Sequence, residues 1–179
     1  ETVPDDAIVT EDVGGFRLWA IQAFETTEPD EMVAAGSWAG MGVGLPAAVG
    51  AALATDGPVV SLAGDGGLMM AIHELHTAVE EGLDVTVVVS NNADYGVISK
   101  SPEIEAYAGA GRFAWGSPDF ATVAEGFGCE ATRVETAAAA GEVVADAVGN
   151  GRVTLVDVAV DPEEPSAAAF ADYESTVDV

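Results

Sequence analysis

The stretch that decides the fold is residues 64–98, which read GDGGLMMAIHELHTAVEEGLDVTVVVSNNADYGVI. Its first part carries apolar side chains at Met69, Ile72, Leu75 and Val79, which is the spacing of one helix face. An apolar run at 59–63 precedes this helix, and a run of almost pure valine at 85–89 follows it. A strand, a helix and a strand in this order predict a βαβ unit whose two strands are parallel and buried on both faces.

The same alternation of short apolar runs and helical patterns extends over the rest of the chain. We expect strands at 7–9, 32–34, 59–63, 85–89, 131–134 and 153–160. We interpret 68–81 as one continuous helix and 98–117 as an irregular surface excursion. The pattern predicts an α/β fold, with a doubly wound, mainly parallel sheet of about six strands and helices on both faces. One domain is expected over 1–165, with 166–179 as a tail or linker.

Charge and composition exclude several classes of function. Acidic residues outnumber basic ones by 31 to 5, which gives a formal net charge of -26. Without a basic patch, the chain is not expected to bind nucleic acid or an anionic membrane. The scarcity of lysine favours adaptation to a salt-rich cytoplasm, where screening weakens repulsion between carboxylates, over an ordinary acidic protein. The single cysteine, Cys129, excludes an internal disulfide and is interpreted as a buried apolar residue. With no signal peptide or long apolar run, we expect a cytoplasmic protein.

Two polar side chains follow successive strands of the predicted sheet. Asp65 comes directly after one strand and Asn92 after the next, so both belong to the carboxyl edge, where open α/β sheets bind ligands. Their hard oxygen atoms suit Mg²⁺, which commonly bridges a protein carboxylate to phosphate groups. Gly66 and Gly67 add bare backbone N–H groups at the start of a helix, which hold phosphate oxygens without a lysine. The sequence therefore predicts a metal-bridged phosphate ligand.

These residues and their flanks resemble one known family. The run 64–98, the upstream run GMGVGLPAAVGAAL at 40–53, and the downstream runs SPDFATVAEGFG and RVTLVDVAVDP are similar to the C-terminal diphosphate-binding domain of thiamine-diphosphate-dependent enzymes of the acetolactate synthase type. The resemblance covers roughly residues 6–162. It implies the thiamine-diphosphate-binding fold, with thiamine diphosphate and Mg²⁺ as cofactors.

The resemblance also implies roles for individual residues. The side chains of Asp65 and Asn92 and the main-chain carbonyl of Asp94 would hold the metal. Met41 would be the apolar wedge that bends the cofactor, and the Ala39 carbonyl, at a position where relatives often have glycine, would bind the aminopyrimidine. The implied cofactor-binding set is Ala39, Gly40, Met41, Gly64, Gly66, Gly67, Asn92, Tyr95, Gly96 and Val97.

The implied activity is decarboxylation or carboligation of a small 2-oxo acid. Relatives draw the activating glutamate from a pyrimidine-binding domain, so no catalytic residue is expected in this chain, and that domain is expected as an upstream segment or a separate subunit. A homodimer or tetramer is expected. The run ISKSPE at 98–103 stands where acetolactate synthases carry a Gln-Trp run, which leaves the particular 2-oxo acid open.

Other interpretations remain open. The chain could be a non-catalytic module that binds thiamine diphosphate, or a Mg²⁺-dependent enzyme acting on another phosphorylated ligand. His73 and His76 lie in an HELH run, which is not the HExxH spacing of zinc enzymes and is better explained by helix packing. Tryptophans are expected in the core or at interfaces, with Trp38 as the candidate to face the active site. Arg17 and Arg112 are candidates for pairing with carboxylates of a partner.

Overall fold

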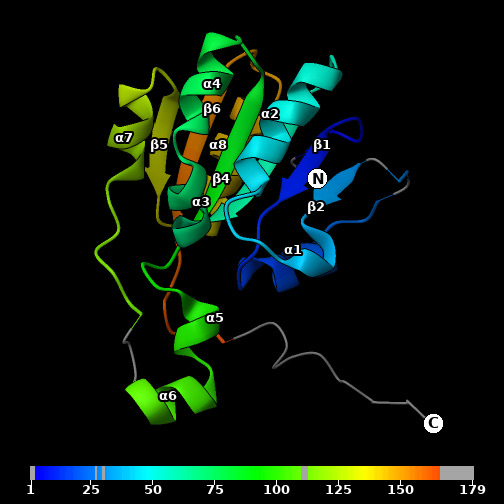
Figure 1. Ribbon diagram of the computed structural model, residues 1–179. Helices are drawn as coiled ribbons and strands as arrows, with labels where there is room; N and C mark the ends of the chain where they lie inside the picture. The colour runs from blue at the N-terminus through cyan, green and yellow to red at the C-terminus, as the bar shows by residue number, and fades with distance from the viewer. Residues whose placement is uncertain (1–2, 27, 30, 110–112, 166–179) are drawn as a thin grey trace, which may run out of the picture.

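A single parallel sheet forms the centre of the molecule (Figure 1). The computed structural model describes residues 3–26, 28–29, 31–109 and 113–165. Within these residues, six strands pair in the order β2-β1-β3-β4-β6-β5, and every neighbouring pair is parallel. The strands are β1 (Ile8–Glu11), β2 (Met32–Ala34), β3 (Val59–Gly64), β4 (Val85–Asn91), β5 (Glu130–Val134) and β6 (Val153–Ala159). This arrangement confirms the predicted doubly wound sheet.

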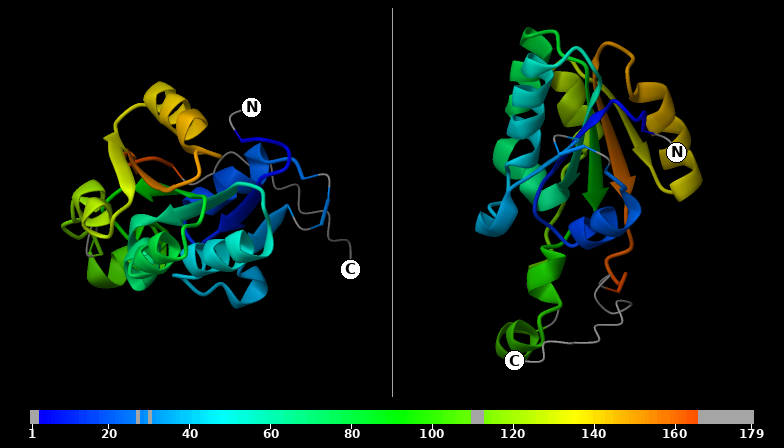
Figure 2. Two further views of the ribbon diagram at one scale, coloured as in Figure 1. Left: turned by 90° about the horizontal axis from the view of Figure 1, so that it is seen from above. Right: turned by 90° about the vertical axis from the view of Figure 1, so that its right-hand side faces the viewer.

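Helices cover both faces of the sheet, as the two views of Figure 2 show. On one face, α2, α4 and α7 bury Leu45, Leu75 and Phe120 against the valines of the central strands. On the other face, α8 buries Val144 against Val156. The helical elements are α1 (Phe16–Ala23), the 3-10 turn η1 (Gly36–Trp38), α2 (Gly44–Ala54), α3 (Asp65–Ala71), α4 (Glu74–Glu80), α5 (Gly96–Ser99), α6 (Pro102–Ala108), α7 (Phe120–Gly126) and α8 (Ala137–Ala147).

The strand order contains a switch point between β1 and β3. The chain leaves β1 for β2 on one side and returns to place β3 on the other side. Connections that diverge in this way open a crevice at the carboxyl ends of the two strands, and ligands of doubly wound folds bind there. The residues that follow β1 and β3 are Asp12 and Asp65, and both are buried.

Three elements differ from the sequence-based expectation. The expected helix 68–81 is two helices, because the Leu75 and His76 N–H groups bond the carbonyls of Ile72 and His73, three residues back, at 3.1 Å. Strand β1 continues beyond Val9 to Glu11, since its polar end pairs with β3 inside the sheet. The segment 98–117, expected to be irregular, contains the second half of α5 and all of α6.

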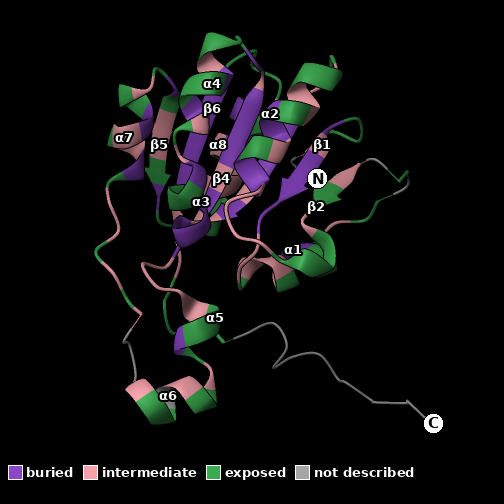
Figure 3. Cartoon of the chain, viewed as in Figure 1, coloured by how far each residue is buried: buried purple, intermediate pink, exposed green. Residues whose placement is uncertain are grey.

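Burial follows the sheet, as Figure 3 shows by colour. The central strands are buried, and Cys129 lies buried just before β5, as expected. Helices α5 and α6 project beyond the carboxyl ends of the strands in Figures 1 and 2. Arg112 and the expected tail 166–179 lie outside the described residues. None of the helices in the described ranges combines the length and apolarity that a membrane crossing needs.

Candidate functional site

Asp65 and the loop after β4 occupy neighbouring strand ends. Gly64, the last residue of β3, pairs in register with Ser90 of β4, so the residues that follow them emerge side by side. Asp65 begins α3 and is 3% exposed, whereas Asn92 is half-buried. The structure therefore brings together the two side chains that the sequence predicted as metal ligands.

The Asp65 carboxylate is held by several donors. Burial raises the pKa of this carboxyl, while hydrogen bonds from the Gly66 N–H and the Trp115 indole act in the opposite direction. The indole Nε1 of Trp115 donates to Oδ2 of Asp65 at 3.1 Å. A carboxylate in this setting is fixed in orientation and poorly hydrated, which is a suitable state for a metal ligand.

The loop 91–95 has a constrained backbone. The side-chain oxygen of Asn92 accepts the Asp94 N–H at 3.1 Å, and that of Asn91 accepts the Ala93 N–H at 3.2 Å. Ala93 lies between them at a φ of 53°, in the left-handed region that a residue with a Cβ rarely adopts. The Asp94 carboxylate accepts a hydrogen bond from Ser99 Oγ. The Asp94 side chain thus binds Ser99. The predicted metal ligand is the main-chain carbonyl of Asp94, not this side chain.

A short segment before α7 fixes this loop from outside. The Trp115 N–H donates to the Ala93 carbonyl at 2.9 Å, and the Tyr95 N–H donates to the Phe113 carbonyl at 3.4 Å. These bonds flank an antiparallel bridge between Asp94 and Ala114, so the bridge does not use the Asp94 carbonyl. The Tyr95 and Trp115 rings stack with centroids 6.2 Å apart. The role of Trp115 was missed from the sequence, where the residue lies in a stretch without periodicity.

Asp12 is a second residue that the sequence interpretation missed. It follows β1 and is 1% exposed. Its carboxylate accepts the Val13 N–H at 2.7 Å and the Gly42 N–H at 2.9 Å. Burial raises the pKa of this carboxyl, and the backbone hydrogen bonds of Val13 and Gly42 oppose that rise. Asp12 thereby anchors the loop that carries Met41 to the end of β1.

Glu11 completes a set of three buried carboxyl groups whose pKa is raised, namely Glu11, Asp12 and Asp65. Glu11 is 2% exposed, and burial raises its pKa, while the nearby Arg17 guanidinium lowers it. The Arg17 Nε donates to Glu11 Oε2 at 3.0 Å. The β1 strand end therefore supplies Arg17 with a carboxylate within the chain, and its pairing with a partner stays a prediction.

Glycines allow the segments of the site to approach one another. A Cβ placed on Gly66 would lie 2.5 Å from the Tyr95 ring, and one on Gly67 would lie 2.5 Å from Asp12 Oδ2. Gly42, at a φ of 80°, packs against Met70 of α3. A side chain at any of these positions would push the segments apart. Gly66 and Gly67 lie in the first turn of α3, which begins at Asp65, three residues before the helix expected from residue 68.

The remaining predicted residues lie around the same edge. The Phe16 ring packs beside Gly64, where a Cβ would lie 3.5 Å from it. A Cβ on Gly15 would lie 3.8 Å from Val97 Cγ2, so the loop after β1 reaches α5. Gly96 begins α5 beside the Asn92 amide. On the other side, Gly40 and Met41 are half-buried in the loop before α2.

The segment 38–39 forms an exposed end of this loop. Ala39 has a φ of 50°, so the residue that replaces the glycine of relatives does sit in a strained backbone conformation. Trp38 is 91% exposed. The side chain lies outside the core, and its expected position facing the active site stays a prediction.

The ligand chemistry of this edge is that of a mixed oxygen site. No cluster of three or more histidine, cysteine, aspartate or glutamate side chains that could hold a metal occurs among the described residues. One carboxylate, one amide oxygen and one main-chain carbonyl leave several positions of an octahedral ion for other oxygen ligands, which is how Mg²⁺ is held beside phosphates. The residues present therefore fit a Mg²⁺ ion that is shared with a phosphorylated ligand.

The two histidines of the HELH run have partners outside this edge. His73 pairs with Glu74, and His76 packs beside Phe127.

Basic side chains are few, and those of the described residues bond oxygens of the same chain. No lysine or arginine of the described part faces the Asp65 edge without such a partner. The pairs are Arg17 with Glu11, Arg133 with Asp157, Arg152 with Glu130, and Lys100 with the main-chain carbonyl of Glu164. An anionic ligand at this edge would therefore depend on a cation or on backbone N–H groups.

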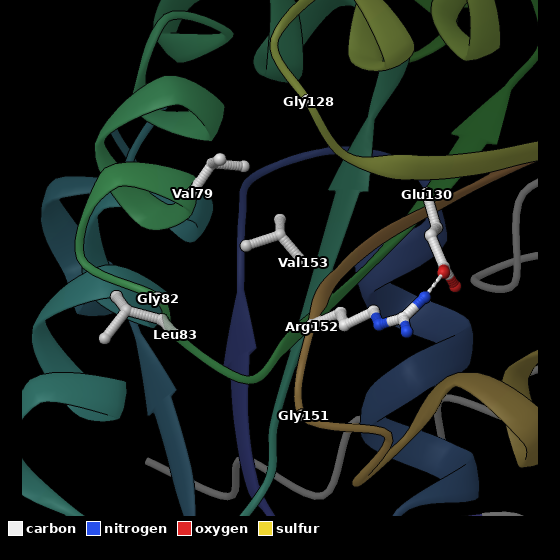
Figure 4. A pocket seen from close by; sticks show the side chains of 8 residues that line it. All are labelled: Val79, Gly82, Leu83, Gly128, Glu130, Gly151, Arg152 and Val153. Atoms are coloured by element: carbon white, nitrogen blue, oxygen red, sulfur yellow. Dashed lines mark hydrogen bonds and ion pairs between the residues drawn. The ribbon is translucent and has the colours of Figure 1, made fainter.

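A separate pocket lies at the opposite, amino-terminal edge of the sheet. It has a volume of about 340 Å³. Figure 4 shows Val79, Leu83 and Val153 lining it, with the ion pair between Arg152 and Glu130 at its side. None of the predicted site residues lines this pocket.

Comparison with known proteins shows the family to which the chain belongs. The sequence model of the family described as "Thiamine pyrophosphate enzyme, C-terminal TPP binding domain" matches residues 12–158 of the chain. The chain belongs to this family. Thiamine pyrophosphate (TPP) is thiamine diphosphate, so the match confirms the predicted family and its cofactor. The matched range includes Asp12, Asp65 and the loop 91–95 of this TPP-binding domain.

Relatives of the TPP-binding domain are large enzyme chains. The acetolactate synthase isozyme 1 large subunit of Escherichia coli is 36% identical over 166 residues, which cover 90% of this chain and 29% of the relative. The probable acetolactate synthase large subunit of Methanococcus aeolicus is 32% identical over 161 residues, which cover 88% of this chain and 26% of the relative. The chain thus spans less than a third of the curated relatives it matches.

Solved structures confirm the fold. The thiamine diphosphate-dependent 4-hydroxybenzoylformate decarboxylase of Rhodococcus jostii has a TM-score of 0.81 at 28% identity, covering 89% of this chain and 30% of that chain. Benzoylformate decarboxylase from Polynucleobacter necessarius has a TM-score of 0.83 at 24% identity, covering 92% and 32%. The chain is therefore a TPP-binding domain of the type found in acetolactate synthases and related decarboxylases.

Proposed function

We propose that Asp65, Asn92 and Asp94 bind a Mg²⁺ ion that bridges the chain to thiamine diphosphate, in an enzyme that decarboxylates or joins small 2-oxo acids. The observation that carries the proposal is the position of the buried Asp65 carboxylate beside the constrained loop 91–95, on adjacent strand ends. The similarity to acetolactate synthase large subunits supports the reaction type.

The charge of the site explains why a metal is needed. Asp12 and Asp65 are both buried near the start of α3, and a diphosphate brought beside them is repelled. The described basic side chains are engaged elsewhere, so they do not offset this repulsion. A divalent cation bound to Asp65 would offset the charge of these two carboxylates and offer the diphosphate oxygens direct coordination.

Thiamine diphosphate, when bound, would supply the nucleophilic chemistry for a reaction with a 2-oxo acid. This chain binds and orients the cofactor. Gly66 and Gly67 would contact the diphosphate through their backbone N–H groups at the start of α3, and Met41 would support the cofactor from the loop that Asp12 anchors. The Ala39 carbonyl accepts a hydrogen bond from the aminopyrimidine. The glutamate that activates the ring comes from a pyrimidine-binding partner domain, and the assembly is a homodimer or tetramer.

The proposal is tested by calorimetric titration of thiamine diphosphate in molar potassium chloride, with Mg²⁺ and then with a chelator. The pyrimidine-binding domain is supplied in the same cell, because the cofactor site is shared. We expect binding that requires Mg²⁺, is lost in Asp65→Ala and is retained in the control Thr136→Ala, whose exposed hydroxyl caps α8. Mg²⁺-dependent binding of ADP in preference to thiamine diphosphate would overturn the proposal.

A further inference from the structure

Trp115 contacts both parts of the proposed metal site, namely Asp65 and the loop 91–95, although it lies far from both in the sequence. Its indole N–H donates to Asp65 Oδ2 at 3.1 Å, across a sequence separation of 50 residues. Its backbone N–H donates to the Ala93 carbonyl at 2.9 Å, in the middle of the loop that carries Asn92 and Asp94. One residue thus ties the end of β3 to the loop after β4.

The Trp115 ring is itself held in place. It stacks on Tyr95 with an interplanar angle of 19°, and the Tyr95 ring lies against Gly66, where a Cβ would be only 2.5 Å away. The adjacent bridge between Asp94 and Ala114 fixes the backbone. The indole N–H therefore has little freedom to leave the Asp65 carboxylate, and it sets the plane in which that carboxylate lies.

We propose that Trp115 is a positioning residue of the metal site, which orients the Asp65 carboxylate through its indole N–H and the loop 91–95 through its backbone N–H. The inference rests on the proposed function of Asp65 as a Mg²⁺ ligand. Groups that hydrogen-bond a ligating side chain lower the cost of arranging it around the ion, and their removal weakens metal affinity by ~10–100-fold.

The test compares Trp115→Phe with wild type. Phenylalanine keeps a ring for the stack on Tyr95 but has no N–H for Asp65. The affinity for Mg²⁺ is measured by calorimetry at a fixed concentration of thiamine diphosphate, with the pyrimidine-binding domain present. We expect Mg²⁺ binding to weaken by about 10-fold or more, while saturating Mg²⁺ restores the wild-type affinity for thiamine diphosphate. Trp19→Phe is the matched control, because Trp19 lies in α1, which carries none of the proposed metal ligands, and it should leave Mg²⁺ affinity unchanged.

A second readout requires no change at position 115. The chain has 3 tryptophans, so protein labelled with 5-fluorotryptophan gives three fluorine resonances that single Trp→Phe variants assign. The Trp115 resonance should shift when Mg²⁺ and thiamine diphosphate are added, and should not shift in Asp65→Asn. If Trp115→Phe does not fold, this measurement tests the role of Trp115 by itself, because an unchanged Trp115 resonance would overturn the inference.

The outcomes separate the two proposals. Wild-type Mg²⁺ affinity in a folded Trp115→Phe variant would overturn the role of Trp115 and leave the Asp65 site intact. Loss of thiamine diphosphate affinity even at saturating Mg²⁺ would also overturn it, because it would indicate a general structural role. Absence of Mg²⁺-dependent binding in wild type would overturn the proposed function itself, and the inference with it.

Discussion

Replacement of Asp12 by alanine should destabilise the protein and loosen the loop that carries Met41. The Asp12 carboxylate accepts the Val13 and Gly42 N–H groups at 2.7 and 2.9 Å. A hydrogen bond to a charged group contributes ~1.5–3 kcal/mol net, so the two together contribute ~3–6 kcal/mol. Burial raises the pKa of this carboxyl, and removal of a poorly hydrated charge returns part of that sum. The expected net loss in the free energy of unfolding is about 2–3 kcal/mol.

Urea denaturation in molar potassium chloride, followed by circular dichroism, measures this loss. Thr136→Ala is the matched control, because Thr136 also accepts a backbone N–H, from Ala139 at 3.2 Å, but is exposed and caps α8 on the other face of the sheet. Loss of such a helix cap costs about 1 kcal/mol and should leave affinity for thiamine diphosphate unchanged. In Asp12→Ala we expect that affinity to fall. A stability within ~0.5 kcal/mol of wild type, together with unchanged affinity, would refute the role assigned to Asp12.

Three further outcomes are expected. Ala39→Gly should raise the melting temperature by about 2–4 °C, since it relieves about 1 kcal/mol of left-handed strain at a φ of 50°; an unchanged or lower value would contradict this. Gly66→Ala should cost about 1–3 kcal/mol because its Cβ meets the Tyr95 ring, whereas Gly50→Ala, with open space in α2, should not destabilise; denaturation curves distinguish the two. The free energy of unfolding should decrease as pH rises above about 4, because the three buried carboxyl groups have raised pKa values and the folded chain retains protons that the unfolded chain has released. Denaturation midpoints between about pH 4 and pH 7 give the sign, and the slope should diminish in Asp65→Asn.

The fold could be predicted because its information is local. The valine run of β4 and the apolar run of β3 are buried on both faces, so their residue types alone mark them as central parallel strands. The position of Asp65 follows from β3 in the same way, because a residue after a parallel strand must emerge at the carboxyl edge. The resemblance added roles for Asn92 and Asp94 that spacing alone does not provide.

Residues that act across long separations could not be predicted in this way. Asp12 contacts Gly42 across 30 residues, and Trp115 contacts Asp65 across 50 residues. An acidic pair after a short apolar run is typical of a solvent-facing loop, so Glu11 and Asp12 gave no sign of burial. The break between α3 and α4 was also missed, because the helical spacing of apolar residues continues through it. At the break, the backbone N–H groups bond the carbonyls three residues back instead of four.

The internal engagement of the basic side chains has a consequence for how fast a cofactor arrives. A chain of net charge -26 presents an approaching diphosphate with a repulsive long-range field, and the described cations are bound too close to their own oxygens to focus that field. Added salt shortens the reach of this repulsion to about 10 Å at 0.1 M. The association rate should therefore increase with ionic strength, the reverse of the usual behaviour of sites that attract anions with lysine and arginine. For this protein, salt would act as a kinetic aid to cofactor capture.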